Sequence, residues 1–171
     1  AHLNACTLLQ ATLDRASFHG ASLTRCLMID VSAQSAVFTQ VNADRVQMSN
    51  QGMFDNADFS SGHWHTCGFR GLSLRGAKAN KTVFIECDLA EAQWCSGQLI
   101  QALFQRCILM QINLSASDCS AALFNETALS KACLVETNLS QVEMHHSDIS
   151  EADCSHALTR GLVQKPLPSL Q

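Results

Sequence analysis

A repeat of five residues runs through residues 57–159 and constrains the fold more than any other feature. Counting in fives from Phe59 to Thr159, 20 of the 21 sites are apolar, in a chain that is 47% apolar. The site two residues earlier is uncharged from Ala57 to Ile112, and most of its residues are small. A period of five fits neither the 3.6 of a helix nor the 2 of a simple strand. It indicates a chain that turns a corner every five residues, with one small and one large side chain pointing inward per side.

These units resemble the pentapeptide-repeat family, whose loose consensus is Ala-(Asp/Asn)-Leu-X-X. The matching units begin at Ala57-Asp58-Phe59, Cys87-Asp88-Leu89, Thr137-Asn138-Leu139, Ser147-Asp148-Ile149 and Ala152-Asp153-Cys154. The resemblance covers nearly the whole chain. It implies an all-β fold, a right-handed quadrilateral parallel β-helix with four pentapeptides per coil and about eight coils.

Four units per coil would place residues 20 apart in the sequence on top of one another. Two sets of residues at this spacing support the expectation, because identical side chains fill equivalent positions in successive rungs about 4.8 Å apart. The first is an aromatic column and the second a column of thiols: Trp64, Phe84, Phe104 and Phe124; Cys67, Cys87 and Cys107.

Residues 1–48 carry the same repeat one register earlier, with centres from Leu3 to Met48. An extra residue therefore falls in residues 49–53, whose Asn, Gly and Ser predict a bulge or small corner loop. Allowing for this slip, Cys6 and Cys26 join the thiol column, and a second aromatic column forms from Phe18, Phe38 and Phe59. We expect one solenoid domain over 1–163, and an extended tail or linker over 164–171, which holds both prolines.

The sequence says less about what flanks this domain and where the protein is located. The repeat is in phase from Ala1. Because solenoids need capped ends, we expect either a fragment of a longer chain or end-to-end self-association. The sequence holds no apolar run long enough for a membrane span and no signal peptide. We expect the bacterial cytoplasm, or secretion by a system that needs no signal peptide.

Cysteine and histidine are the candidate chemical groups. Most of the nine cysteines fall on inward sites, where Cys behaves as a small hydrophobe, and no CxxC pair is present. Cys95 and Cys133 fall on outward sites and are the more reactive candidates. The pairs His63/His65 and His145/His146 share a side but lie four coils apart, roughly 19 Å, too far to share one metal ion. We therefore expect no metal, no cofactor and no catalytic residue, and no enzyme motif is present.

Charge offers two further hypotheses. The net charge is −4, and the acidic residues scatter over all four sides. The basic residues Arg70, Arg75, Lys78 and Lys81 form a band around one coil, which gives little support for nucleic-acid binding. The leading interpretation is a non-catalytic protein-interaction or scaffold module of a larger bacterial protein, such as a secretion-system effector or adaptor, with an unidentified protein partner. The alternative comes from the quinolone-resistance members of the resembled family: a DNA mimic that binds DNA gyrase or topoisomerase. That mimicry requires a contiguous acidic stripe.

Overall fold

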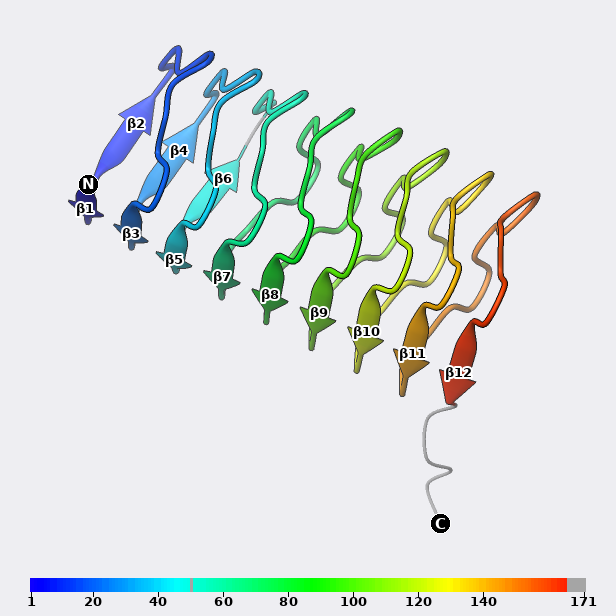
Figure 1. Ribbon diagram of the computed structural model, residues 1–171. Helices are drawn as coiled ribbons and strands as arrows, with labels where there is room; N and C mark the ends of the chain where they lie inside the picture. The colour runs from blue at the N-terminus through cyan, green and yellow to red at the C-terminus, as the bar shows by residue number, and fades with distance from the viewer. Residues whose placement is uncertain (50, 166–171) are drawn as a thin grey trace.

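The chain winds into a parallel β-solenoid of about eight coils (Figure 1), which the computed structural model describes over residues 1–49 and 51–165. The expected right-handed, four-sided β-helix is confirmed. Nine short strands form one long sheet: β1 (His2–Asn4), β3 (Ser22–Thr24), β5 (Asn42–Asp44), β7 (His63–His65), β8 (Val83–Ile85), β9 (Leu103–Gln105), β10 (Leu123–Asn125), β11 (Glu143–His145) and β12 (Val163–Lys165). A second sheet contains β2 (Thr7–Leu9), β4 (Leu27–Ile29) and β6 (Gln47–Ser49).

The four sides of the coil are seen in four separate columns of parallel pairing. The long sheet is the first face, and the second face is the sheet of β2, β4 and β6, continued by single bridges from Gly68 to Asp148. The third face is a column of bridges from Thr12 to Asp153, and the fourth a column from Ser17 to Leu158. The third face therefore lies opposite the long sheet. In each column the paired residues are 20 or 21 apart, so every coil lies in register on the next.

The corners are made by one residue in five with a left-handed backbone. Ser61 and Thr66 have φ values of 59° and 53°, and the same conformation recurs at the equivalent sites. Such a backbone is costly for a residue with a side chain. Hydrogen bonds along the stack offset that cost, because the corner amide donates to the next coil, as Thr66 N does to the Ile85 carbonyl at 2.9 Å. Most corners also close a turn, as Gly62 N does by donating to the Phe59 carbonyl at 3.1 Å.

The core is the inside of the coil and contains the two restricted sites of each repeat. Residues at both sites are buried from Ala21 to Met144. The first coil is only partly covered, so Leu3 and Phe18 pack against the core without being fully buried. Burial of these apolar side chains is the main source of stability for the solenoid.

The extra residue and the expected tail fall at two places in this stack. The pairing step changes from 20 to 21 residues between the pairs Ile29–Ser49 and Ser32–Met53. Of the intervening residues, Asn50 lies outside the described ones. The predicted tail starts at Gln164, but Gln164 still belongs to β12 and pairs with Met144. The solenoid thus extends to residue 165, and 166–171 lie outside the described residues.

In the described part of the chain, no helix is long and apolar enough to cross a membrane.

Candidate interaction surface

The two aromatic columns lie inside the coil. On the fourth face, the ring of Phe38 stacks on Phe18 at 4.9 Å and on Phe59 at 5.2 Å between centroids. Under the long sheet, Phe84, Phe104 and Phe124 stack at 5.0 Å with nearly parallel rings. These are offset-stacking distances, which add to the gain from burial. The stacked rings therefore tie each coil to the next from inside.

Trp64 shares the register of the long-sheet column but not its ring stacking. It pairs with Phe84 along the sheet, yet its ring meets Phe59 and Phe69 edge-on at 5.4 and 5.2 Å. Its indole N–H is buried without an acceptor. The stack predicted from Trp64 to Phe124 therefore starts at Phe84. The larger indole needs extra space, and Gly62 supplies it: a Cβ there would lie 2.7 Å from Trp64 Nε1.

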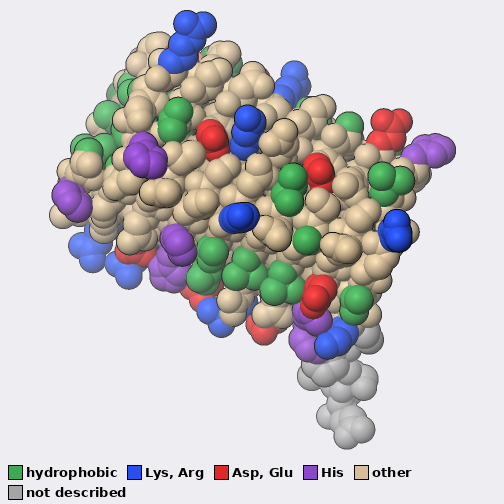
Figure 2. Space-filling model, in the orientation of Figure 1, with side chains coloured by type: hydrophobic (Ala, Val, Ile, Leu, Met, Phe, Trp, Pro, Cys, Tyr) green, Lys and Arg blue, Asp and Glu red, His purple; other side chains and the backbone are tan. Residues whose placement is uncertain are grey.

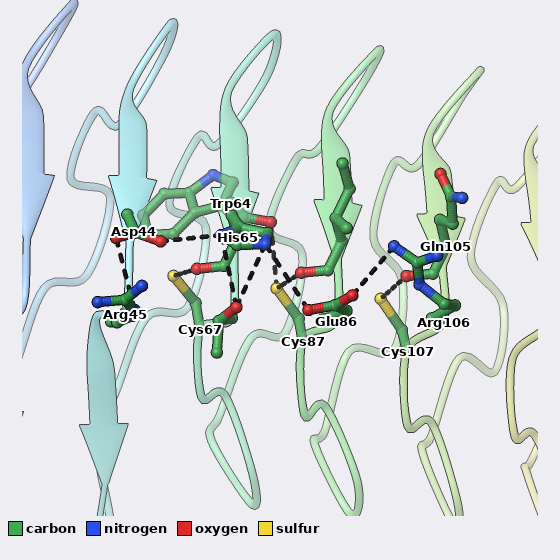
Figure 3. Close-up of polar contacts among 12 residues, drawn as sticks. Asp44, Arg45, Trp64, His65, Cys67, Glu86, Cys87, Gln105, Arg106 and Cys107 are labelled. Atoms are coloured by element: carbon green, nitrogen blue, oxygen red, sulfur yellow. Dashed lines mark hydrogen bonds and ion pairs between the residues drawn. The ribbon is translucent and has the colours of Figure 1, made fainter.

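The predicted thiol column lies at the corner between the long sheet and the second face (Figure 3). Cys87 Sγ donates to the Trp64 carbonyl at 3.2 Å, and Cys107 Sγ donates to the Phe84 carbonyl at 3.4 Å. Cys67 Sγ makes the equivalent contact to the Ala43 carbonyl, at 3.8 Å. Hydrogen bonds to Cys107 and Cys67, together with burial, raise the pKa of Cys87. The reactive form of cysteine is the thiolate, so Cys87 is held in its unreactive state.

The other cysteines differ in exposure. Burial raises the pKa of Cys119 to about 12 and that of Cys6 to about 11. Cys95 and Cys133, on outward sites, are half-buried. Cys154 occupies an inward site but is exposed, since its coil lies near the end of the described stack. What burial remains, together with the charge of Asp153, still raises the pKa of this thiol.

A ladder of charged and polar side chains follows the same corner on the outside (Figure 3). His65 Nδ1 lies 2.8 Å from Asp44, and its Nε2 lies 3.7 Å from Glu86. Glu86 in turn lies 3.0 Å from Arg106. The hydrogen bond from His65 lowers the pKa of Asp44. All four side chains are substantially exposed, so each pair contributes little to stability.

The ion pairs of Arg70 and Lys131 also join neighbouring coils. Arg70, from the predicted basic band, lies 3.1 Å from Glu91 and 3.6 Å from Asp88 on the second face. On the same face, Lys131 lies 3.8 Å from Glu151. Much of the charge on this face is therefore balanced within the chain.

The outer surface of the long sheet carries an apolar row that the sequence analysis missed. Val83, Leu103 and Leu123, which we call the outer row, lie directly beside one another in β8, β9 and β10. Ile85 lies next to the row on β8. Figure 2 shows hydrophobic side chains gathered along this sheet. All four are half-buried, because each covers its neighbour, and the row is bounded by His63 and Glu143.

The equivalent sites on two other faces are polar in the same coils. On the third face they are Ser73, Gln93 and Asn113; on the fourth face they are Lys78, Gln98 and Asp118. The signal was present in the sequence. Val83, Leu103 and Leu123 precede a repeat centre, where the consensus has Asp or Asn, and they recur every 20 residues.

Residues 1–49 and 51–165 enclose no pocket. In the same part of the chain, no group of three or more His, Cys, Asp or Glu side chains is arranged to hold a metal ion. The two histidine pairs lie on β7 and β11, or just beyond them, with β8, β9 and β10 between.

The model of the family described as pentapeptide repeats matches residues 1–30 and 122–158, with eight copies. The match and the four-sided coil agree. This chain carries pentapeptide repeats. A trypsin-treated variant of QnrB1, a plasmid-mediated fluoroquinolone resistance protein, is 14% identical to it with a TM-score of 0.54, covering 96% of this chain and 92% of that one.

HetL, a pentapeptide-repeat protein involved in heterocyst differentiation regulation in the cyanobacterium Nostoc, is 14% identical with a TM-score of 0.36, covering 95% of this chain and 86% of that one. No curated protein matches the sequence. At these identities, the likeness to QnrB1 shows a shared fold alone.

Proposed function

We propose that this pentapeptide-repeat protein is a non-catalytic module that binds a protein partner on the outside of its long sheet. The outer row of Val83, Leu103 and Leu123 carries the proposal. It places large aliphatic side chains on three successive strands of a regular sheet, where the third and fourth faces carry polar residues. Apolar side chains grouped at a surface and rimmed by polar ones are typical of protein interaction sites.

The repeated acidic residues support a structural role rather than acid–base chemistry. Asp88 accepts a hydrogen bond from the backbone N–H of Ala90 at 3.0 Å, and Asp118 accepts one from Ser120 at 2.9 Å. Asp148 and Asp153 make the same contact. The backbone N–H of Ser150 lowers the pKa of Asp148, and the hydroxyl of Ser155, followed by its backbone N–H, lowers the pKa of Asp153. A side chain that bonds the backbone two residues ahead stabilises a turn. These carboxylates therefore stabilise the turns at the corners of the coil.

The DNA-mimic hypothesis receives less support. Mimicry of a phosphate path needs negative charge along one side. The described carboxylates lie on all four faces, for example Asp44, Glu91, Asp55 and Asp118 on or beside the first, second, third and fourth. Several are also paired with a base in the next coil. The similarity in fold to QnrB1 is not evidence that this chain binds gyrase or topoisomerase.

For its setting we propose a larger bacterial protein, in the cytoplasm or exported without a signal peptide, in which this module serves as an effector or adaptor surface. The support is indirect. A rod with a filled core and one apolar outer surface suits a scaffold that holds a partner along its length.

The test compares the wild-type chain with two variants as affinity baits in bacterial lysate. Leu103→Glu places a charge in the outer row, and Ile108→Glu places the same charge on the next face of the same coil, at a side chain 44% exposed. We expect a partner recovered by the wild-type protein and Ile108→Glu but depleted at least roughly tenfold with Leu103→Glu, the cost of a desolvated charge in an interface. Equal recovery by all three baits would contradict the proposal.

A gyrase supercoiling assay separates the two hypotheses. The interaction-module account predicts no inhibition when the chain is added. Inhibition at around 1 µM, a binding energy of about −8 kcal/mol, would favour the DNA mimic instead.

A further inference from the structure

The outer surface of the long sheet has the same order of chemistry from either end. Along β7 to β11 it presents His63, Val83, Leu103, Leu123 and Glu143. The central three are aliphatic and each end has a hydrogen-bonding group. Leu103 is the centre of this arrangement. A surface with such a centre can meet an inverted copy of itself, which is the requirement for a two-fold symmetric interface.

We propose that the partner of the outer row is a second copy of this chain, packed face to face with the two rods antiparallel. The proposal rests on the proposed function and names its partner. In this arrangement Leu103 meets its own counterpart, and Val83 meets Leu123 of the other copy. Both copies have rungs about 4.8 Å apart, so alignment of the central rungs also aligns all the remaining rungs.

The ends of the row match across the same axis. His63 of one copy comes opposite Glu143 of the other, where an imidazole N–H can donate to a carboxylate. Glu143 already lies 2.8 Å from His145 in its own chain, and a carboxylate has acceptor sites for more than one donor. The aliphatic centre is thus closed at both ends by a donor–acceptor pair.

The neighbouring column of the same strands fits the same axis. Gln105 lies beside the centre on β9, so it meets its own counterpart, and two side-chain amides can each donate to and accept from the other. Arg106 also approaches its counterpart, at the corner. Its charge is balanced by Glu86 at 3.0 Å within the same chain. Parallel rods would instead set Leu103, the centre of the outer row, against the amide of Gln105. The antiparallel arrangement keeps the outer row apolar and has its apolar–amide contact beside the row, where Ile85 faces Asn125.

The size of the surface sets the expected strength. Five rungs span about 19 Å, and strands of three residues are about 10 Å wide, so the face is well below the roughly 800 Å² per partner of a standard interface. We therefore expect a reversible dimer with a dissociation constant of roughly 10 µM to 1 mM.

Sedimentation velocity over a concentration series tests the contact. The wild-type chain and Ile108→Glu are expected to shift from monomer toward dimer together between about 10 µM and 1 mM. Leu103→Glu is expected to need at least about tenfold higher concentration, because the two introduced carboxylates meet at the axis. A wild-type chain that stays monomeric overturns the proposal, and so does a dimer that Leu103→Glu leaves intact. Circular dichroism of each variant verifies that the fold is retained.

Cysteine cross-linking under oxidised glutathione tests the antiparallel register. Leu103→Cys is expected to form a dimer linked by a disulfide between its two copies. In this exchange, two protein thiols are oxidised to one disulfide and one oxidised glutathione is reduced to two glutathione molecules. Val83→Cys alone is expected to stay at the wild-type background, and to cross-link when mixed with Leu123→Cys. The wild-type chain, with its nine cysteines, gives the background. Self-linking of Val83→Cys at the yield of Leu103→Cys overturns the register.

The two proposals can fail separately. If the wild-type chain is monomeric but Leu103→Glu loses a captured protein, self-pairing is wrong and the module function stands. If the dimer is lost in Leu103→Glu, while captured proteins are unchanged, self-pairing stands and binding of another partner at this face is wrong.

Discussion

The inner and outer surfaces of the long sheet differ although the same strands make both. Phe104 points into the coil and is fully buried, whereas its neighbour Leu103 points outward and is half-buried. Inside, apolar residues occupy the site from β1 to β11. Outside, large aliphatic residues occupy the site in three successive strands, β8 to β10, and again on β12 at Val163, beyond Glu143. The inner row is required by the fold, and the outer row is not. The inner surface therefore accounts for stability, and the proposed function gives the outer surface the role of recognition.

The largest effect should come from the inner surface. Phe104→Ala removes the central ring of the Phe84–Phe124 stack and leaves a hole in a rigid coil. We expect the free energy of unfolding to fall by about 3–5 kcal/mol, measured by thermal or urea melts. Leu103→Ala in the same strand is the control, with an expected loss of roughly 1 kcal/mol, because its side chain already contacts water. An equal loss of unfolding free energy in the two variants would contradict the distinction between the inner and outer surfaces.

An intermediate effect is expected at a glycine inside the coil. A Cβ at Gly97 would lie 2.6 Å from Trp94 Cδ1 and 3.0 Å from the Ala77 carbonyl oxygen, and neither can move freely. Gly97→Ala should therefore lower the unfolding free energy by about 1–3 kcal/mol through overpacking. Gly71→Asn at a corner is the control, since nothing lies within 4 Å of its Cβ and Glu91 has a similar φ of 62°. A Gly97→Ala melt identical to wild type would contradict this packing.

The corner ladder outside the coil should matter less. Glu86→Ala removes contacts to Arg106 and His65 at exposed side chains, so we expect a loss of no more than about 1 kcal/mol, and less in high salt. Glu126→Ala, two coils further along the same corner, should change stability by less than about 0.5 kcal/mol. A loss at Glu126 as large as that at Phe104 would mean that this corner is part of the stabilising core.

The smallest effect concerns pH. The hydrogen bond from His65 holds the pKa of Asp44 below its ordinary 3.8. A lowered carboxyl pKa favours the folded state above the unfolded value, and this contribution is lost as pH falls through the folded value. NMR titration should show the Asp44 midpoint below 3.8 in the wild-type chain and nearer to 3.8 in His65→Ala. An unchanged midpoint in that variant would contradict the contact.

The sequence predicted the coil well because the repeat specifies one geometry. A period of five with small and large inward sites indicates a corner every five residues, and the family resemblance implies four sides. The spacing of 20 supports four sides and predicts which residues align. The repeat could not determine how the aromatic rings are oriented in the core. Trp64 shares the register of Phe84 yet meets Phe59 and Phe69 edge-on, because the shape of an indole is resolved only by its neighbours.

The candidate surface was missed for a different reason. In the sequence we follow the inward sites and take the residue before each centre to be polar, as in the consensus. The outer row becomes visible only when those positions are compared across coils, 20 residues apart. The left-handed corner at every fifth residue was likewise not evident, since Lys81, Glu91 and Gln101 are ordinary residues that the stack holds in an unfavourable backbone conformation.

Methyl NMR of the wild-type chain over a concentration series tests the central claim most directly. The account predicts that the methyl signals of Val83, Leu103, Leu123 and Ile85 shift together as concentration rises, while those of Leu9 and Leu158, exposed on other faces, stay in place. Shifts confined to residues of the first or last coil, such as Leu3 and Leu162, would instead indicate end-to-end contact. That result would contradict the assignment of recognition to the long sheet.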